Sequence, residues 1–333
     1  MITRMGALAL WAVVACHGQA DAPRVQISNG SIHASLLLPD AQRGYYRGTR
    51  FDWSGQIASL IYKGHEYFGK WFDKYDPVIH DAILGPVEEF VAATGGLGYD
   101  DVRAGESFVR IGVGAVRKPE EARYRQFHTY EITDPGVWKV NPRKDRVEFV
   151  HELGNTSGYA YTYRKIVRLA SGRKPRMVLE HTLHNRGSKV IDTSVYEHNF
   201  YVIDGQPSGP EFAVKFPFEV KAARELGGRA EAAGKELRYL RELESGQSVF
   251  TELSGYGDSV RDYDIRVENR KSGAGVRQTS DRPLSKLVLW SIRSTVCPEA
   301  FIHMNIAPGE SFSWKIVYDF YELSAKSAGG DRP

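Results

Sequence analysis

Residues 159–169 read Tyr159-Ala160-Tyr161-Thr162-Tyr163-Arg164-Lys165-Ile166-Val167-Arg168-Leu169, and this stretch decides the predicted fold. Successive side chains of a β-strand point to opposite faces of its sheet. Three tyrosines, Val167 and Leu169 therefore share one face, and Lys165 lies among them. This period of two predicts a strand with one face in the core.

The same period recurs along most of the chain, and turn sequences such as Asn185-Arg186-Gly187-Ser188 separate the predicted strands. The nearest approach to a helix, residues 224–241, is interrupted by three glycines. Because strands do not alternate with helices, we expect an all-β fold, a large antiparallel sandwich of two sheets. The other predicted strands are 32–38, 57–62, 108–116, 124–133, 146–153, 177–183, 190–203, 263–268, 286–292, 300–306 and 311–323.

The composition is that of a folded globular chain. Of its 333 residues, 42% are hydrophobic and 26% are charged, unlike the charge-rich and apolar-poor composition of disordered chains. The 44 basic and 41 acidic residues leave a formal charge of +3, which gives no electrostatic case for nucleic acid as a partner. With only 2 cysteines, the chain cannot build a disulfide framework.

The first twenty residues predict a secretory signal peptide. Arg4 precedes nine consecutive apolar residues, Ala7–Ala15, which are too few to cross a bilayer but typical of a signal peptide. Gly18 and Ala20 then supply small residues for cleavage after position 20. We therefore expect a periplasmic or secreted protein.

Val13-Val14-Ala15-Cys16 supports an alternative, because it is similar to a bacterial lipobox. Processing before Cys16 would leave a lipid-bearing N-terminus, so membrane association is expected only if Cys16 is lipidated. Otherwise we expect residues 1–20 to be removed, residues 21–323 to form a single β domain, and residues 324–333 to form a flexible tail.

The strongest local signal of a functional site is Ser194-Val195-Tyr196-Glu197-His198-Asn199-Phe200-Tyr201. A strand that only packs does not need three polar groups in a row. Either Glu197 and Asn199 face one side and His198 the other, or the strand is bulged. An imidazole with its ordinary pKa of about 6.5 can donate a proton at neutral pH. The alternative is a core histidine whose ring is satisfied by a backbone carbonyl.

A second signal is Glu299, which lies between Pro298 and Ala300 at the mouth of a hydrophobic strand. Partial burial would raise the pKa of this carboxyl and suit it to general-base work. The alternative is a turn carboxylate in solvent. Nearby Cys297 is not expected to be a nucleophile, because nothing around it marks a thiolate.

Two further features suggest a carbohydrate site. Glu88 and Glu89 follow Gly85-Pro86, as in a loop that enters a cleft. The early chain is also rich in aromatic rings, which stack on sugar rings, and in charged groups, which bind hydroxyls. These residues are Tyr45, Tyr46, Phe51, Trp53, Tyr67, Phe68, Trp71, Phe72 and Tyr75 with Arg47, Arg50, Asp52, Asp73 and Asp76.

Other common sites are not supported by the sequence. Gly95-Gly96-Leu97-Gly98 lacks the Lys-Ser/Thr sequel of a phosphate loop. His181 and His184 lie three apart on a predicted strand, so they face opposite sides of the sheet and do not share a metal ion. We expect neither a metal nor a cofactor.

These motifs, in this order, resemble the galactose mutarotase-like superfamily, which includes the aldose 1-epimerases and the hexose-6-phosphate epimerases. The resemblance extends over about residues 49–323 and implies a β-supersandwich of antiparallel strands. The matching segments are Thr49–Leu60 for the opening hairpin, Glu197–Tyr201 for the strand of the catalytic acid, Val296–Ala300 for the strand end of the catalytic base, Ile306–Glu310 for the closing Pro-Gly-Glu turn and Tyr318–Phe320 for the last strand.

The resemblance implies that Glu299 takes the proton of the anomeric hydroxyl while His198 protonates the ring oxygen. The sugar ring then opens, the aldehyde rotates, and closure gives the other anomer. Contacts with the substrate are expected from Glu88, Glu89, Arg117, Lys118, Tyr124, His128 and Asn199.

The chain also departs from the family. The early Asn-Arg segment, whose Arg binds the sugar, corresponds here to the acidic stretch 85–90, and only His128 is a candidate for a second substrate-binding histidine. These differences favour a sugar other than galactose or glucose, such as a product of oligosaccharide breakdown. We expect a monomeric isomerase of the bacterial envelope that acts on a sugar or oligosaccharide. The alternatives are a non-catalytic sugar-binding protein and a lyase on the same fold.

Overall fold

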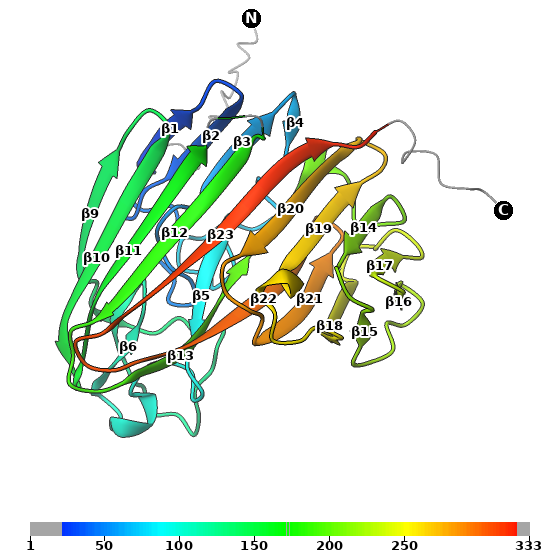
Figure 1. Cartoon of the computed structure of the whole chain (residues 1–333). Coiled ribbons are helices and arrows are strands. Elements are labelled where there is room, and N and C mark those ends of the chain that lie inside the picture. Colours follow the sequence, from blue (N-terminus) through cyan, green and yellow to red (C-terminus); the bar gives the residue numbers. More distant parts are fainter. Residues whose placement is uncertain (1–21, 171, 173, 325–333) are drawn as a thin grey trace, which may run out of the picture.

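The computed structural model describes residues 22–170, 172 and 174–324 (Figure 1). The predicted signal peptide with Cys16 and nearly all of the predicted tail lie outside these ranges. Within them, regular structure consists of β-strands and three short 3-10 helices, which confirms the expected all-β class. No helix in the described ranges is long and apolar enough to span a membrane. The 3-10 helices are η1 (Tyr99–Asp101), η2 (Ile203–Gly205) and η3 (Val260–Asp262).

The largest sheet has ten antiparallel strands and crosses the front of the molecule in Figure 1. Strand β11, third from one edge of this sheet, contains the stretch 159–169, and the predicted strand is confirmed there. In spatial order the strands are β16 (Ala230–Ala233), β17 (Glu236–Tyr239), β14 (Phe212–Lys215), β19 (Asp264–Asn269), β20 (Ala274–Ser280), β23 (Ser311–Glu322), β12 (Arg176–Asn185), β11 (Tyr159–Ala170), β10 (Arg146–Thr156) and β9 (Val137–Pro142).

A six-stranded antiparallel sheet lies behind the first and packs against it face to face (Figure 1). The ring of Phe90 from this sheet contacts the ring of Tyr163 from β11, with centroids 5.4 Å apart. In spatial order the strands are β15 (Lys221–Ala222), β18 (Ser248–Ser254), β21 (Lys286–Ile292), β22 (Thr295–Ile306), β13 (Ile191–His198) and β5 (Val87–Val91). The expected sandwich of two sheets is therefore present.

Two small sheets complete the regular structure of the described residues. A four-stranded sheet contains β1 (Arg24–Ser28), β2 (Ile32–Leu37), β3 (Ile57–Tyr62) and β4 (His65–Glu66). A three-stranded sheet contains β6 (Ser107–Arg110), β7 (Gly114–Arg117) and β8 (Ile132–Asp134).

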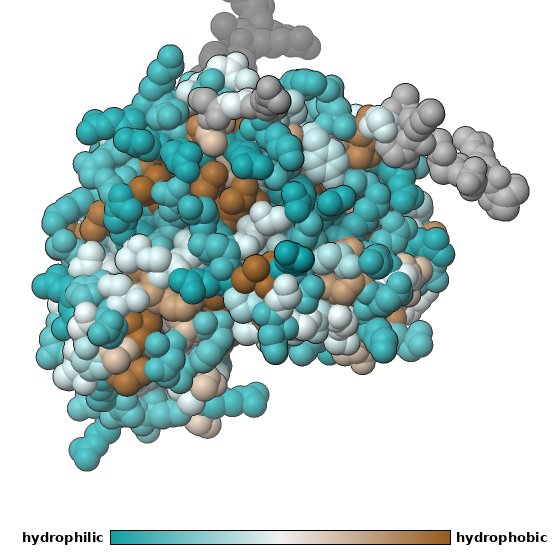
Figure 2. Space-filling view, in the orientation of Figure 1, coloured by the Kyte–Doolittle hydropathy of each residue, from teal (hydrophilic) through white to brown (hydrophobic). Residues whose placement is uncertain are grey.

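The alternation of β11 has the predicted consequence for packing. Tyr161, Tyr163 and Val167 are buried between the two large sheets, and so is Lys165. The opposite face of the ten-stranded sheet, seen in Figure 2, is mostly hydrophilic. Ion pairs such as Arg164–Glu148 cross that outer face. Burial of the apolar side alone explains why the period of two is so regular in these strands.

Three predicted strands differ in the structure. The predicted strand over residues 190–203 ends early, because β13 stops at His198 and Ile203 begins the 3-10 helix η2. Residues 108–116 form parts of two strands, β6 and β7, because the chain turns at Gly112. Its φ of +79° lies in the left-handed region, and a Cβ at this position would lie 2.7 Å from Asp52.

The predicted strand over residues 124–133 was wrong except at its end, where β8 begins at Ile132. The rings of Tyr124 and Tyr130 stack on each other within a loop, with centroids 5.5 Å apart. The hydroxyl of Tyr130 also donates to Glu121 at 2.9 Å. Local ring packing, not a sheet, thus accounts for the spacing of these aromatic residues.

Candidate functional site

His198 and Glu299 lie together on the outer face of the six-stranded sheet. Strands β13 and β22 are antiparallel neighbours, with Tyr196 opposite Phe301. His198 lies two residues after the first and Glu299 two residues before the second, so both side chains leave the sheet on the same side. The Nε2 atom of His198 is 3.3 Å from the Oε1 atom of Glu299.

Aromatic rings enclose the imidazole of His198. The ring of Phe200 stacks on it with centroids 3.7 Å apart, and Trp71 stacks behind Phe200 at 4.4 Å. Phe51 and Trp290 approach the imidazole edge-on at 5.6 and 5.4 Å. Phe200 reaches this position with a φ of +43°, in a region that non-glycine residues rarely adopt and that clusters at functional sites.

This enclosure determines where protons reside. Burial lowers the pKa of His198 well below its usual 6.5, and the positive charge of Arg50 lowers it further. Burial also raises the pKa of Glu299 to about 8, although Arg50 and Lys286 act in the opposite direction. At neutral pH the carboxyl of Glu299 is therefore protonated and the imidazole of His198 is neutral. The pair holds one proton between its two facing atoms.

Arg50 is the cation whose charge lowers the pKa of both members of the pair. Its Nε donates to Glu89 at 2.8 Å, and its NH2 group donates to the hydroxyl of Tyr196 at 3.2 Å. Its guanidinium also lies 4.4 Å from the ring centre of Phe51 and 5.0 Å from that of Phe127. These contacts hold a planar cation rigidly at the wall of the site.

The pair opens into a cavity of about 360 Å³, within the range of about 300–1,000 Å³ that is typical of small-molecule sites. Phe127 and Phe250 are 58% and 47% exposed at this cavity, so flat apolar surfaces face any ligand that enters. The lining residues are Arg50, Trp71, His80, Asp81, Val91, Gln126, Phe127, Tyr196, His198, Phe200, Phe250, Lys286, Val288, Trp290, Glu299 and Phe301.

Comparisons with known proteins bear on the fold of this chain. No family model and no curated protein matches the sequence. Among solved structures, a candidate aldose 1-epimerase from Escherichia coli K12 superposes with a TM-score of 0.55 at 12% identity, covering 90% of this chain and 99% of that one. A galactose mutarotase-like protein from Lactobacillus casei gives 0.52 at 12% identity, covering 90% and 100%. The GalM/aldose epimerase homologue from C. elegans gives 0.52 at 13% identity, covering 91% and 100%.

The chain has the galactose mutarotase-like fold. The resemblance that the sequence motifs indicate is thereby confirmed for the fold. At identities of 12–13%, these likenesses concern the fold alone, and function has to be argued from the site.

Within this mutarotase-like fold, Glu89, Lys118 and Tyr124 lie near the His198–Glu299 pair or next to its cavity. Glu89 is buried and anchors Arg50. Lys118 and Tyr124 line a second cavity of about 550 Å³ that shares Val91 and Gln126 with the first.

The structure does not bring the other expected contact residues to the cavity. Arg117 is exposed and pairs with Glu131 at 2.8 Å. His128 is half-buried outside the cavity lining and contacts Arg125. Glu88 and Asn199 point into the space between the sheets, because both alternate with residues that face the cavity. Adjacent residues of a strand cannot face the same side, and this separates Asn199 from His198.

The inward-pointing groups form a buried charged cluster. Lys165 donates to Glu88, and the second oxygen of Glu88 lies 2.7 Å from Nε2 of His181. Burial raises the pKa of Asp52 to about 8 and raises that of Glu197 well above its usual value. Burial acts in the same direction on Glu88, but the charge of Lys165 and the hydrogen bond of His181 lower the pKa of Glu88 to about 2. The cluster thus combines a charged Lys165–Glu88 pair with two carboxyl groups that retain their protons.

A metal ion could in principle use part of this cluster. Ligand atoms of Glu88, His181 and Glu197 all lie within 4.8 Å of one another. However, the ammonium of Lys165 already binds Glu88, so a cation is present at this point. His184 faces away from the cluster and contacts the carbonyl of Glu310 at 3.1 Å, as the three-residue spacing from His181 predicts.

Several lining residues were not singled out from the sequence. Trp290 and Lys286 alternate with buried Leu287 and Leu289 on β21. The sequence signal that could have identified Trp290 is its place on β21, where it alternates with buried leucines and so lies on the outward face of the strand. Gln126 and Phe127 lie in the loop 118–131, for which no sequence pattern predicts a place in the cavity.

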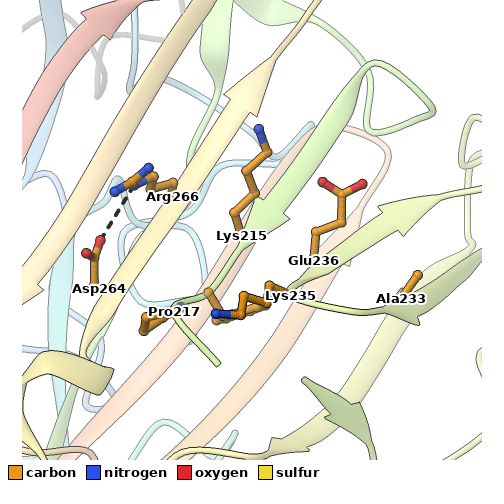
Figure 3. Close-up of a pocket in the computed structure, with 8 residues that line it drawn as sticks. Lys215, Pro217, Ala233, Lys235, Glu236, Asp264 and Arg266 are labelled. Atoms are coloured by element: carbon orange, nitrogen blue, oxygen red, sulfur yellow. Dashed lines mark ion pairs between the residues drawn. The ribbon is translucent and has the colours of Figure 1, made fainter. Parts of the chain in front are cut away.

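A separate pocket of about 380 Å³ lies on the outer face of the ten-stranded sheet, among β14, β17 and β19. Figure 3 shows Lys215 and Glu236 projecting from neighbouring strands there, and Arg266 pairing with Asp264 at 3.7 Å. Its lining contains no histidine, and its charged side chains are lysine, arginine and carboxylate groups such as the Arg266–Asp264 ion pair. The cavity at His198 is therefore the better candidate for chemistry.

Proposed function

We propose that the chain is an acid/base catalyst that interconverts the anomers of a sugar, as an aldose 1-epimerase-like isomerase. The observation that carries the proposal is the 3.3 Å contact between Nε2 of His198 and Oε1 of Glu299 inside an aromatic-lined cavity. Aromatic faces bind the apolar sides of sugar rings, and a facing acid and base can move two protons in one step.

The geometry of the pair fits the atoms that react. The anomeric hydroxyl oxygen and the ring oxygen of a sugar are bonded to the same carbon, so one ring presents both to the pair at once. The carboxyl of Glu299 gives its proton to the ring oxygen, and neutral His198 takes the proton of the anomeric hydroxyl. The bond between the anomeric carbon and the ring oxygen breaks, and the aldehyde forms.

Ring closure restores the pair. After the aldehyde has rotated, the carboxylate of Glu299 takes the proton from the sugar hydroxyl, and the imidazolium of His198 returns its proton to the carbonyl oxygen. This order of proton transfers is the reverse of the order that the family resemblance implies. The reason for proposing it is the burial of both groups, which favours the uncharged form of each.

Arg50 has a positioning role in this proposal. The pairs with Glu89 and Tyr196 fix its guanidinium, which donates to sugar hydroxyls from a constant place. Trp290 and Phe127 supply the flat surfaces of the same cavity. The substrate is thereby held with its reactive carbon at the pair, which is the condition for efficient proton transfer.

The test is the rate of anomer exchange, measured by polarimetry and by NMR exchange between anomeric protons for a panel of reducing sugars. Glu299→Gln is expected to lower the rate at least about 100-fold, the usual contribution of a general acid or base. Glu131→Gln changes an exposed carboxyl away from the cavity and serves as the matched control. Binding without turnover by the unaltered protein would indicate a non-catalytic sugar-binding protein and would overturn the proposal.

We also propose that the chain acts in the bacterial envelope as a processed, single-domain protein. The support is the apolar run Ala7–Ala15 and the small residues at positions 18 and 20. Mass spectrometry of the N-terminus of the cellular protein tests this. A start at Asp21 is expected, a lipid-modified Cys16 would indicate a membrane-anchored form, and an intact Met1 would contradict the proposal.

A further inference from the structure

The cavity at His198 is continued by a second one that the proposed reaction does not use. Val91 and Gln126 line both cavities, so the two adjoin at these side chains. The second cavity measures about 550 Å³, compared with about 360 Å³ for the first. A third cavity of about 300 Å³ adjoins the second along Ala92–Thr94. The residues that follow β5 thus border a row of cavities that starts at the reactive pair.

The second cavity is built around the ring of Tyr124. Gly95 has a φ of +111°, and a Cβ there would lie 2.2 Å from that ring. The ring of Tyr124 also stacks against the ring of Tyr130, and its centre lies 5.7 Å from the guanidinium of Arg110. Arg110 in turn donates to the carbonyl of Gly95 at 3.1 Å. A glycine is therefore required at position 95 because the Tyr124 ring leaves no room for a side chain there. This accounts for the first glycine of the stretch 95–98, which is not a phosphate loop.

The polar groups of this cavity suit a neutral, hydroxyl-rich ligand. The hydroxyl of Tyr124 makes no hydrogen bond to the described residues, and nor do the side chains of Thr94, Asp100 and Arg123 that share the lining. Asp100 and Arg123 balance each other in charge. The other charged lining residues are engaged elsewhere, because Glu89 pairs with Arg50, Glu121 pairs with Arg125 and Lys118 donates to the carbonyl of Tyr99. Unused donors and acceptors of both kinds, with one unpaired charge of each sign, therefore favour sugar hydroxyls over an anion or a cation.

The division between the two cavities is narrow. Gln126 donates to Oε1 of Glu89 at 2.9 Å, and Glu89 holds Arg50 on the side of the reactive pair. The hydrogen-bonded side chains of Gln126, Glu89 and Arg50 therefore separate the two cavities, and they present hydrogen-bonding groups to both. A glycosidic bond across Val91 and Gln126 would place adjoining sugar rings in adjoining cavities.

We propose that the second cavity is a subsite for a further sugar unit, and that the substrate is a neutral oligosaccharide whose reducing-end ring lies at His198 and Glu299. This rests on the proposed anomer exchange. One or two hydrogen bonds to the second ring, each worth about 1 kcal/mol, correspond to an increase of roughly tenfold in kcat/KM.

The experiment measures kcat/KM for anomer exchange at the reducing end of mono-, di- and trisaccharides in each of three series. The first is glucose, maltose and maltotriose, the second is galactose with its β-1,4-linked dimer and trimer, and the third is glucose, cellobiose and cellotriose. Ala93 is exposed and borders the second and third cavities. In Ala93→Trp the indole fills this space, so the ratio of kcat/KM for disaccharide over monosaccharide is expected to fall from about ten to near one. Ala104→Trp, at an exposed position that lines none of these cavities, should keep the wild-type ratio.

The outcomes separate the two proposals. Exchange of monosaccharides with a disaccharide ratio near one in the unaltered protein would overturn the second subsite and leave the acid/base proposal standing. A raised ratio that survives Ala93→Trp would also overturn it. Absence of exchange for every probe and for every sugar of the wider panel of reducing sugars would overturn the proposed function itself.

Discussion

Replacing Glu299 by glutamine should remove a pH-dependent cost of folding. Burial raises the pKa of Glu299 to about 8, compared with a usual value of 4.5. Between these two values the folded state binds a proton that the unfolded state does not bind. Stability therefore falls as pH rises through this window, by up to about 1.4 kcal/mol per pH unit. A glutamine side chain does not titrate, so the free energy of unfolding of Glu299→Gln lacks this contribution to its pH dependence.

The magnitude follows from the window chosen. Between pH 6.5 and pH 8 the wild-type protein should lose up to roughly 2 kcal/mol more stability than Glu299→Gln. Other buried carboxyls with raised pKa values, Asp52 and Glu197, are present in both proteins and cancel in the difference. The measurement is urea unfolding of both proteins at the two pH values.

The control for this measurement is a glutamine substitution at an exposed carboxyl. Glu131→Gln changes a carboxyl that is 64% exposed, so its pH dependence should parallel that of the wild type. If Glu299→Gln also parallels the wild type between pH 6.5 and pH 8, Glu299 does not hold a proton in the folded state, and the assigned proton transfers are wrong.

Two further predictions concern residues around the site. Lys165→Met should destabilise the protein by about 3–5 kcal/mol in urea unfolding, because it leaves the buried charge of Glu88 without its partner. Lys189→Met, which breaks an exposed pair, should cost less than about 1 kcal/mol, and equal losses for the two variants would contradict the reasoning. Arg50→Lys should raise KM at least about threefold with a smaller change in kcat, since lysine keeps the charge but loses the planar contacts; an unchanged KM in steady-state exchange assays would exclude Arg50 from substrate binding.

Much of the fold could be predicted because local alternation reports burial directly. The residues of β11 show this most clearly, since the same alternation that defines the strand also selects its buried face. The ion pair of Lys165 could not be predicted in this way. Its partner Glu88 is 77 positions away in the sequence, and no local pattern indicates that a buried lysine will meet a buried carboxylate across two sheets.

The site could be predicted in part for a similar reason. His198 and Glu299 are marked by polar residues within apolar strands, and each is visible locally. That they face each other depends on the pairing of β13 with β22. Burial by Phe51, Phe200 and Trp290 comes from three separate segments, so the direction of the pKa shift of His198 could not be obtained from its neighbours in sequence.

The pH profile of anomer exchange tests the proposed acid/base pair most directly. Exchange requires one proton on the pair, which burial places on Glu299 up to a pKa of about 8 and keeps off His198 until well below pH 6.5. The account predicts a plateau of kcat/KM through neutral pH and a fall above about pH 8, with both lost in Glu299→Gln. A rate that rises with ionisation of a carboxyl near pH 4.5 and stays constant beyond pH 9 in an otherwise stable protein would contradict it.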